Sequence, residues 1–383
     1  MKYIPYILLS FILFTTAANA QSRKTDDALL LEYYQNQRFA DALTYLKGIY
    51  AEPVSDINEL SRLAYTSAMA NKLPDAENFY QRLYDKDSTN KSVLYNLASI
   101  NQRRGNIAKA EIYFKKLVAI DTTNFNAYNR LAQIYREKKD GIKNEVYYFE
   151  KANSLNPTDA DVASDLCDAY IMQNQPAKAK KVLTIAIAAD PDNIILQQSL
   201  LRLNYTESNW RETVKTGEQL LLLGDSTTST IAKLGRAYYQ TRSYTCGIAT
   251  LLTISDVNQT ETSTYFIAAC YKQLKDQRKA IFYLNKAITL SISTGTAVYY
   301  NEVADSYETL KQFIKAREAY QKGLLYDDKP ITYYFLATMY DTELKDKKNA
   351  LKYYKKFIAG KIEADQKKYA DYSTARIALL SSK

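Results

Sequence analysis

Histidine is absent from the 383 residues, and cysteine, glycine and proline are scarce. Without histidine, the usual Ser–His and Cys–His nucleophile pairs cannot form, and the commonest zinc sites lose a ligand. Neither a G-x-G-x-x-G loop nor a Walker loop is present. We therefore expect no enzyme activity, no cofactor and no metal site. Ten glycines and seven prolines leave little material for hairpin turns or linkers, which favours an all-α chain.

Only three cysteines occur, and they are widely spaced: Cys167, Cys246 and Cys270. An odd and sparse set does not build a disulfide framework. Cys167 is expected to be a buried free thiol. Cys246 and Cys270 lie in segments that should be neighbours, so a disulfide between them and a pair of free thiols both stay open.

The first twenty residues have a composition of their own. Lys2 precedes an apolar run of eleven residues, 4–14, and the sequence Ala-Asn-Ala ends at Ala20. This order is typical of a secretory signal peptide, whereas a membrane anchor needs about 20 apolar residues. We predict a signal peptide over residues 1–20 and a mature chain without a transmembrane segment, periplasmic or secreted.

A period of 34 residues organises the rest of the chain. Each repeat contains two amphipathic helical patterns of about a dozen residues, joined by a short polar turn. The ten repeats begin near Arg23, Ile57, Lys91, Phe125, Ala160, Ile194, Thr228, Glu261, Ala297 and Pro330.

Small residues recur at two places of the repeat. The eighth residue is small in eight repeats: Ala64, Ala98, Ala132, Cys167, Gly235, Ala268, Ala304 and Ala337. The twentieth is alanine in seven: Ala42, Ala76, Ala110, Ala179, Ala280, Ala316 and Ala350. Two helices that pack closely need small side chains where their axes approach. These places therefore predict the crossing point of a helical hairpin.

Large residues recur at two further places. The eleventh is tyrosine in seven repeats: Tyr33, Tyr135, Tyr170, Tyr238, Tyr271, Tyr307 and Tyr340. The twenty-fourth is often aromatic: Tyr80, Phe114, Phe149, Tyr320 and Tyr354. We expect these side chains to bridge one hairpin to the next, which accounts for part of the total of 35 tyrosines.

This pattern, as in DLCDAYIMQNQPAKAKKVLTIAIAADPDN over residues 165–193, resembles the tetratricopeptide repeat. The resemblance covers about residues 23–363 and implies a right-handed α-solenoid of about ten hairpins over residues 21–363. A solenoid leaves its last hairpin uncovered, so residues 364–383 are predicted to form a C-terminal capping helix. The glutamine after the cleavage site, with much Tyr, Asn and Lys, is similar to exported proteins of Bacteroidota.

The repeat over residues 194–227 departs from the pattern. It has Leu201 in place of the small residue, Thr213 in place of alanine and Gly217 in place of the aromatic, and it contains the only tryptophan, Trp210. A diverged repeat that still packs is favoured. A hinge or a specialised contact repeat is the alternative.

The resemblance also implies a binding surface. In such arrays the second, fifth, ninth, twelfth and thirteenth places of the repeat face a concave groove. Arginine and tyrosine are the residues that anchor protein interfaces. The candidate partner-binding residues are Tyr95, Arg103, Arg136, Asp168, Arg202, Tyr205, Arg236, Tyr239, Tyr265 and Lys272. The carboxylate clamp known in the family is not predicted, because only Asn96 and Arg130 match its places.

Two functions follow as hypotheses. The first is an exported scaffold that binds a partner protein or peptide in the groove. The second is a module for an anionic glycan or envelope polymer, because the chain from Asp341 onward has 11 Lys and Arg against 6 Asp and Glu. Nucleic acid is not expected as a partner of an exported chain without a nucleic-acid-binding motif.

Overall fold

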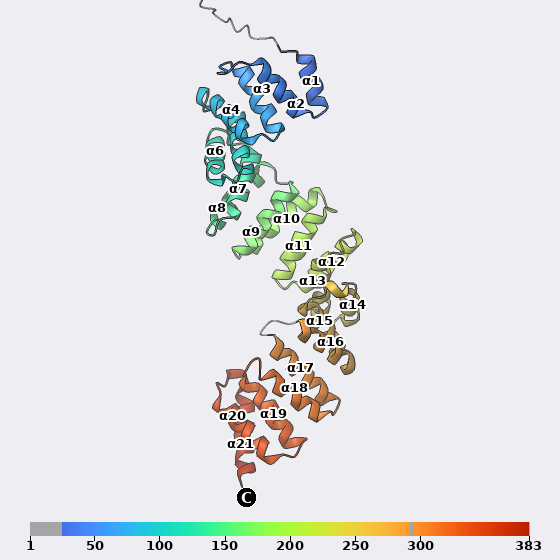
Figure 1. Cartoon of the computed structure of the whole chain (residues 1–383). Coiled ribbons are helices and arrows are strands. Elements are labelled where there is room, and N and C mark those ends of the chain that lie inside the picture. The colour runs from blue at the N-terminus through green and yellow to red at the C-terminus, as the bar shows by residue number, and fades with distance from the viewer. Residues whose placement is uncertain (1–24, 291–294, 383) are drawn as a thin grey trace, which may run out of the picture. The chain divides into compact units, whose positions relative to one another are not determined.

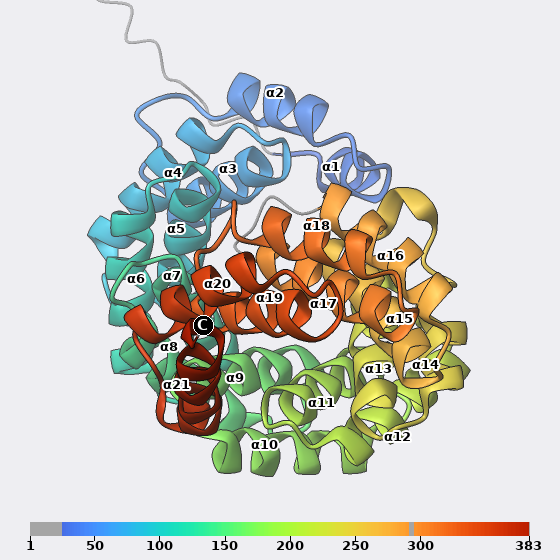
Figure 2. The same ribbon diagram turned by 90° about the horizontal axis from the view of Figure 1, so that it is seen from below.

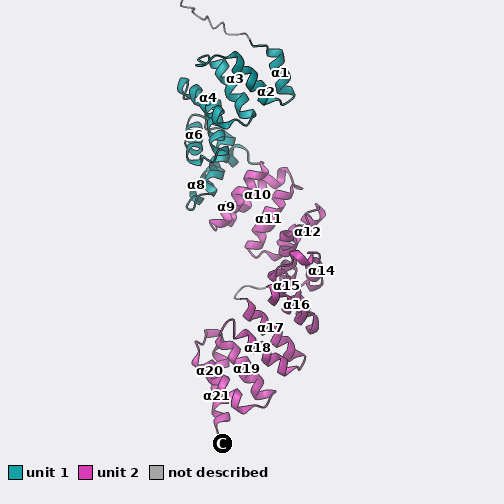
Figure 3. Ribbon diagram, in the orientation of Figure 1, with its two compact units in different colours: residues 1–157 teal, residues 158–383 magenta. Residues whose placement is uncertain are grey.

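The computed structural model describes residues 25–290 and 295–382, and every regular element in these ranges is helical (Figure 1). The predicted signal peptide, residues 1–20, and its cleavage site lie outside the described residues. The chain divides into two compact units, unit 1 up to Pro157 and unit 2 from Thr158 (Figure 3).

Unit 1 has eight α-helices among its described residues, and each odd-numbered helix packs against the next to form a hairpin. They are α1 (Asp27–Gln35), α2 (Phe39–Ile49), α3 (Ile57–Met69), α4 (Leu73–Lys86), α5 (Lys91–Arg103), α6 (Ile107–Ile120), α7 (Phe125–Arg136) and α8 (Ile142–Leu155).

Unit 2 continues the hairpins with thirteen α-helices among its described residues. They are α9 (Ala160–Met172), α10 (Pro176–Ala189), α11 (Ile194–Thr206), α12 (Trp210–Leu222), α13 (Thr228–Gln240), α14 (Tyr244–Leu251), α15 (Glu261–Gln273), α16 (Gln277–Leu290), α17 (Thr296–Thr309), α18 (Phe313–Gly323), α19 (Pro330–Thr342), α20 (Lys347–Ala359) and α21 (Lys367–Ser381). Within the ranges that the structure covers, no helix combines the length and the apolar character needed to cross a membrane.

In eight of the ten repeats the first helix starts where a polar side chain caps it, whereas α17 and α19 have no side-chain cap. A side-chain oxygen accepts a hydrogen bond from a backbone N–H of the first turn, which satisfies a donor that has no partner inside the helix. The capping residues are Asp26, Asp56, Asn90, Asn124, Asp159, Asn193, Thr227 and Thr260. Helices α3, α5, α7, α9, α11, α13, α15 and α19 begin at the predicted residues, and α17 begins one residue earlier.

The small residues at the eighth and twentieth places are all buried, which confirms their predicted place in the core. Gly235 shows how little room there is. A Cβ built on Gly235 in α13 would lie 2.3 Å from Cγ of Leu251 in α14, and Leu251 is itself fully buried. The close approach of two helices in a hairpin therefore depends on these small side chains.

The tyrosines at the eleventh place pack differently from the prediction. Three of their rings stack inside their own hairpin: Tyr135 on Tyr148 at 5.5 Å between ring centroids, Tyr271 on Tyr283 at 5.6 Å, and Tyr340 on Tyr353 at 5.6 Å. Contacts with the preceding hairpin also occur: the Tyr135 hydroxyl donates to Glu111 of α6, and Lys115 of α6 lies 5.4 Å from the Tyr135 ring. In α13, the Tyr238 hydroxyl donates to Glu218 of the preceding α12 at 2.7 Å.

The diverged repeat packs in the same manner as its neighbours. Helices α11 and α12 contact each other, and both contact α13. Leu201 and Thr213 are buried at the places where small residues were expected. Gly217 stands in place of the aromatic residue and makes room for Leu234 of α13. A Cβ built on Gly217 would lie 3.0 Å from Cδ1 of Leu234.

The predicted capping segment contains α21, which packs against α20. Arg376 of α21 donates two hydrogen bonds of 2.7 Å to the buried carboxylate of Asp341. The Tyr354 hydroxyl donates to the same carboxylate at 3.2 Å. Removing Arg376 would leave a buried charge unpaired, which costs several kcal/mol in general.

From α9 to α14 the first helices of the repeats lie in one row and the second helices in another (Figure 2). Helices α9, α11 and α13 lie on the inner side in this view, and α10, α12 and α14 on the outer side. Helix α11 contacts both α9 and α13, and α13 contacts α15. Equivalent places on these four helices are therefore neighbours in space.

We predict that Gly235→Ala destabilises the protein by about 1–3 kcal/mol, because the added methyl group overpacks the contact with Leu251. Gly48→Ala in α2 is the matched control, since a Cβ at Gly48 meets nothing within 4 Å. Replacing a helical glycine in open space is neutral or stabilising by up to about 1 kcal/mol. Urea unfolding of the two variants measures both changes. Equal effects would contradict the packing argument.

Candidate functional site

Seven of the ten candidate residues lie in unit 2, on the four neighbouring helices α9, α11, α13 and α15. They occupy the fifth, ninth and twelfth places, and all seven are partly exposed. We call this set the inner row: Asp168, Arg202, Tyr205, Arg236, Tyr239, Tyr265 and Lys272.

One end of the inner row is an ion pair between neighbouring helices. The guanidinium group of Arg202 in α11 donates to the carboxylate of Asp168 in α9. The two side chains keep 42% and 32% of their surface exposed. The pair can therefore contact a ligand while it holds Arg202 in one orientation.

Arg236 occupies the middle of the inner row, among aromatic rings. Its Nη1 donates to the Tyr205 hydroxyl at 2.8 Å. Its Cζ lies 5.3 Å from the ring centroid of Tyr205, 5.5 Å from Trp210 and 5.3 Å from Phe266. These distances are typical of cation–π contacts. The guanidinium group is thus fixed by its surroundings, while its Nε is buried and bonds to none of the described residues.

The aromatic contacts continue from α13 to α15. The ring of Tyr239 lies 5.5 Å from Phe266, and Phe266 lies 5.3 Å from Tyr265, between centroids. Burial raises the pKa of both the Tyr239 and the Tyr265 phenols. Both therefore stay protonated at neutral pH and can donate hydrogen bonds.

The other end of the inner row is acidic. Lys272 of α15 forms ion pairs with Glu302 and, at 2.8 Å, with Asp305 of α17. Burial alone would lower the pKa of Lys272, but these contacts outweigh burial and raise it. Lys272 is thus a charged residue whose charge is balanced by its neighbours.

Lys233, one turn before Arg236 in α13, lies beside the inner row. Its ammonium group donates to the Ser229 side chain, and none of the described carboxylates bonds to it. Burial lowers the pKa of Lys233 and the nearby charge of Arg202 lowers it further, while the Asp225 carboxylate offsets part of this shift. The fold thus holds two like charges near each other, which is unfavourable and is common at binding sites.

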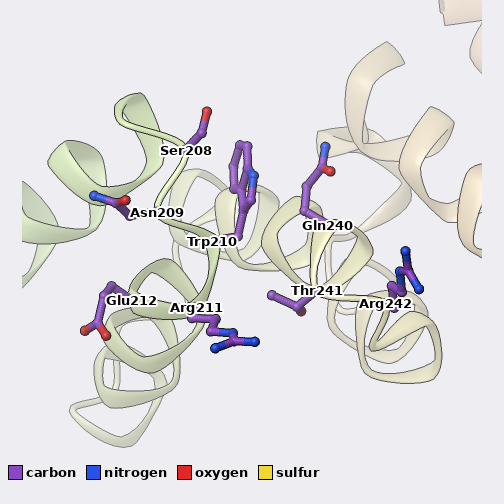
Figure 4. Close-up of a pocket in the computed structure, with 8 residues that line it drawn as sticks. All are labelled: Ser208, Asn209, Trp210, Arg211, Glu212, Gln240, Thr241 and Arg242. Atoms are coloured by element: carbon purple, nitrogen blue, oxygen red, sulfur yellow. The ribbon is translucent and has the colours of Figure 1, made fainter.

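A cavity of about 540 Å³ lies beside the inner row, between two hairpin turns (Figure 4). We call it the turn pocket; its lining is Ser208, Asn209, Trp210, Arg211, Glu212, Gln240, Thr241 and Arg242. In Figure 4 the Trp210 indole and the Gln240 side chain stand on opposite sides of a gap, with Thr241 below. Trp210 connects the turn pocket to the inner row, because it lines the pocket and also contacts Arg236 and Tyr205.

The remaining three candidates lie in unit 1 and are engaged inside their own unit. The Tyr95 ring lies 5.9 Å from that of Phe114. Arg103 donates to Asn71 at 3.0 Å. Arg136 donates to the buried carboxylate of Glu145 at 2.9 Å. A binding role for these three residues stays a prediction.

Sequence reasoning considered the sixth place of the repeat only for the carboxylate clamp, at Asn96 and Arg130, and left it out of the candidate binding residues. Lys233, Phe266 and Glu302 all occupy it, and each contacts or neighbours a member of the inner row. The sixth place lies one helical turn from the second and ninth places, so a pattern based on helical faces could have included it. Trp210 was noticed only as a departure from the repeat.

The three cysteines are free thiols in the structure. Cys246 is exposed on α14, whereas Cys167 and Cys270 are buried. Burial raises the pKa of Cys167 and of Cys270 to about 12. Of the two alternatives for Cys246 and Cys270, the structure therefore has the pair of free thiols and not the disulfide.

Models of the tetratricopeptide repeat match four segments of the chain. One model matches residues 146–203, and another matches residues 92–124, 263–291 and 297–330. The chain therefore carries tetratricopeptide repeats in these segments. Such repeats bind protein partners, and proteins built from them are generally scaffolds rather than enzymes.

Several solved structures are similar in fold. A tetratricopeptide repeat protein from Parabacteroides merdae is 14% identical, with 65% of this chain and 98% of that chain covered and a TM-score of 0.44. The C-terminal part of a repeat protein from Cytophaga hutchinsonii is 18% identical, with coverages of 69% and 95% and a TM-score of 0.47. YrrB, described as having an unusual peptide-binding site, is 14% identical, with coverages of 53% and 96% and a TM-score of 0.39. No curated protein sequence matches the chain.

We predict that Lys233→Met makes the protein more stable at pH 7. The folded-state pKa of Lys233 lies below its unfolded value, so the unfolded chain binds the proton more tightly and the charge destabilises the fold. This penalty disappears as the pH rises toward the unfolded value of about 10.4. Urea unfolding at several pH values should show a gap between variant and parent that narrows with rising pH.

The matched control is Lys181→Met, because Lys181 is exposed on α10. An exposed substitution of this kind changes stability by no more than about 0.5 kcal/mol. A Lys233→Met variant that is less stable than the parent at pH 7 would show that the ammonium group stabilises the fold and is not held at a cost.

Proposed function

We propose that the protein is an exported scaffold that binds an extended segment of a partner protein along the inner row. The observation that carries this proposal is the arrangement around Arg236, where one guanidinium group is fixed by Tyr205, Trp210 and Phe266 and still belongs to a partly exposed surface. Arginine, tyrosine and tryptophan are the side chains that dominate binding energy at protein interfaces.

Preorganisation supports the proposal further. Within the inner row, Asp168 and Arg202 hold each other through an ion pair. Lys272 is held by an ion pair to Asp305 of α17, and Tyr239 and Tyr265 are held by tilted and edge-on contacts with the Phe266 ring. A partner therefore has less side-chain entropy to remove on binding. The helices that carry the row are rigid elements, which favours a defined geometry over an adaptable surface.

The turn pocket gives such a segment a place for one larger side chain. It lies beside Arg236 and shares Trp210 with the surroundings of that residue. Its lining combines the indole ring with the polar side chains of Gln240 and Thr241. A planar or aromatic side chain of the partner would fit between the indole and the amide.

Export is the second part of the proposal, and only the sequence supports it. Lys2, the apolar run over residues 4–14 and the cleavage sequence before Gln21 carry the argument. We predict that the protein isolated from its native cells begins at Gln21. Mass spectrometry of the intact protein tests this. A mass that includes residues 1–20 would contradict cleavage.

The competing function is binding of an anionic glycan or envelope polymer through the basic C-terminal part. Helix α20 carries exposed lysines that would serve it: Lys347, Lys348, Lys352, Lys355 and Lys356. A polymer held by such charges binds less tightly as salt screens them, whereas an interface with aromatic anchors loses much less.

We predict that cross-linked affinity capture from native cells recovers one defined partner protein with the tagged chain. A triple variant with Arg202→Ala, Arg236→Ala and Tyr239→Ala should lose at least nine-tenths of it, because truncating central interface residues commonly costs 2 kcal/mol or more. The control changes Lys347, Lys352 and Lys356 to Ala and should capture the partner normally.

The scaffold hypothesis would be overturned if the partner is still captured by the triple variant of the inner row, is captured less by the lysine variant and is lost in high salt. That combination would move the binding site to α20 and favour the anionic polymer.

A further inference from the structure

A second cavity, of about 580 Å³, lies within unit 1 where α6, α7 and α8 meet. This volume is within the range of pockets that bind small ligands. We call it the tyrosine pocket. None of the described residues that line it is acidic. Its lining includes Lys115, Val118, Ala119, Tyr128, Tyr148 and Lys151.

One repeat earlier, the chain itself fills the equivalent place between α4 and α6. The Tyr84 ring of α4 lies edge-on to the Tyr113 ring of α6, with 5.6 Å between centroids. The Tyr84 hydroxyl accepts a hydrogen bond of 2.6 Å from Lys116. The next residue, Asp85, accepts one of 2.8 Å from Gln81. This place therefore contains a phenol ring and a carboxylate that belong to α4.

Helix α8 brings the same two partner groups to the tyrosine pocket. Tyr148 and Lys151 occupy the places in α8 that Tyr113 and Lys116 occupy in α6. The Lys151 ammonium group lies 5.7 Å from the Tyr147 ring, and none of the described residues accepts a hydrogen bond from it. Its three N–H donors are therefore available to a ligand.

Helix α6 lacks the two groups that α4 supplies. Val118 and Ala119 stand 34 residues after Tyr84 and Asp85, so a ring and a carboxylate are missing at these places. The cavity lies against the two smaller side chains. Tyr128 of α7 forms part of the wall but does not close the cavity. The pocket thus has space for a ring beside Tyr148.

Negative charge is also in deficit around the tyrosine pocket. Two acids lie near it, and both are engaged. The Glu111 carboxylate is shared by Lys115, at 2.7 Å, and Lys138. Asp121, whose charge acts on the Tyr128 phenol, lies 3.5 Å from an ammonium group of α5. With Lys151, four ammonium groups stand around two carboxylates. An anionic group of a ligand would reduce this imbalance.

We propose that the tyrosine pocket binds a phenol ring with a neighbouring carboxylate, the two groups that Tyr84 and Asp85 supply one repeat earlier. The ring lies against Tyr148, its hydroxyl accepts a hydrogen bond from Lys151, and the carboxylate faces Lys115. A free aromatic acid and a tyrosine followed by an acidic residue in a polypeptide both have this chemistry. The pocket is in unit 1, so the inference does not depend on the inner row.

Calorimetric titration of the full chain tests the proposal with two probes, 4-hydroxyphenylacetate and the peptide acetyl-Tyr-Asp-amide. Tighter binding of the first would indicate a free aromatic acid, and tighter binding of the second a polypeptide segment; both results support the proposed chemistry. The methyl ester of 4-hydroxyphenylacetate has no charge, and cyclohexylacetate has no phenol ring. Each should bind about tenfold more weakly than 4-hydroxyphenylacetate, or weaker still.

Three variants locate the site. Val118→Tyr restores the ring that Tyr84 supplies one repeat earlier, so it should abolish binding while the free energy of unfolding does not fall. Lys151→Met should weaken binding about tenfold or more, because it removes a charge-assisted hydrogen bond. Lys143→Met, at an exposed place of the same helix outside the pocket, is the matched control and should change affinity less than about twofold.

The proposal would be overturned if neither probe binds at concentrations up to about 10 mM. Binding that is equal in the parent, Val118→Tyr and Lys151→Met would also overturn it, because the ligand would then lie elsewhere. Equal binding of 4-hydroxyphenylacetate and its methyl ester would contradict the role of the carboxylate.

Discussion

The close approach of two helices at a small residue is the constraint on which the rest of this structure depends. Ala98 and Ala110 are completely buried where α5 meets α6, and Gly235 plays the same part between α13 and α14. Because most hairpins have a small residue at the same two places, their helices can approach each other to a similar distance. Side-chain caps mark the start of the first helix in eight of the ten repeats and so fix the register along most of the chain.

That regular spacing creates the inner row. Residues at the ninth and twelfth places of neighbouring first helices come together without being close in sequence, as Asp168 and Arg202 do. Three features of this surface need no partner for their structure: the ion pairs at its ends, the tilted and edge-on ring contacts and the fixed guanidinium group of Arg236. Lys233 is different, because its charge is held near that of Arg202 at a cost to stability. Most of this cost comes from burial, and the Asp225 carboxylate offsets part of it.

Most of the fold could be predicted from the sequence, because the 34-residue period appears directly in the positions of small and capping residues. The tyrosines at the eleventh place could not be assigned in the same way. The period identifies equivalent residues, but it does not determine whether Tyr271 stacks on Tyr283 of its own hairpin or on a residue of the next hairpin. The site was predicted in part. Its members on α9, α11, α13 and α15 follow from the repeat, whereas Phe266, Lys233 and Trp210 depend on contacts between repeats that no single repeat contains.

The central claim is that the partner lies on the inner row of unit 2, and site-specific photo-cross-linking in native cells tests it most directly. A benzophenone amino acid would replace Thr206 on α11, one residue after Tyr205, or Thr184 on the outer helix α10. The two threonines are a matched pair, since both are exposed and each hydroxyl donates to a carbonyl one turn earlier at 2.8 Å. The account predicts a discrete cross-linked product from position 206 and none from position 184. A product from position 184 alone, or equal products from both, would contradict it.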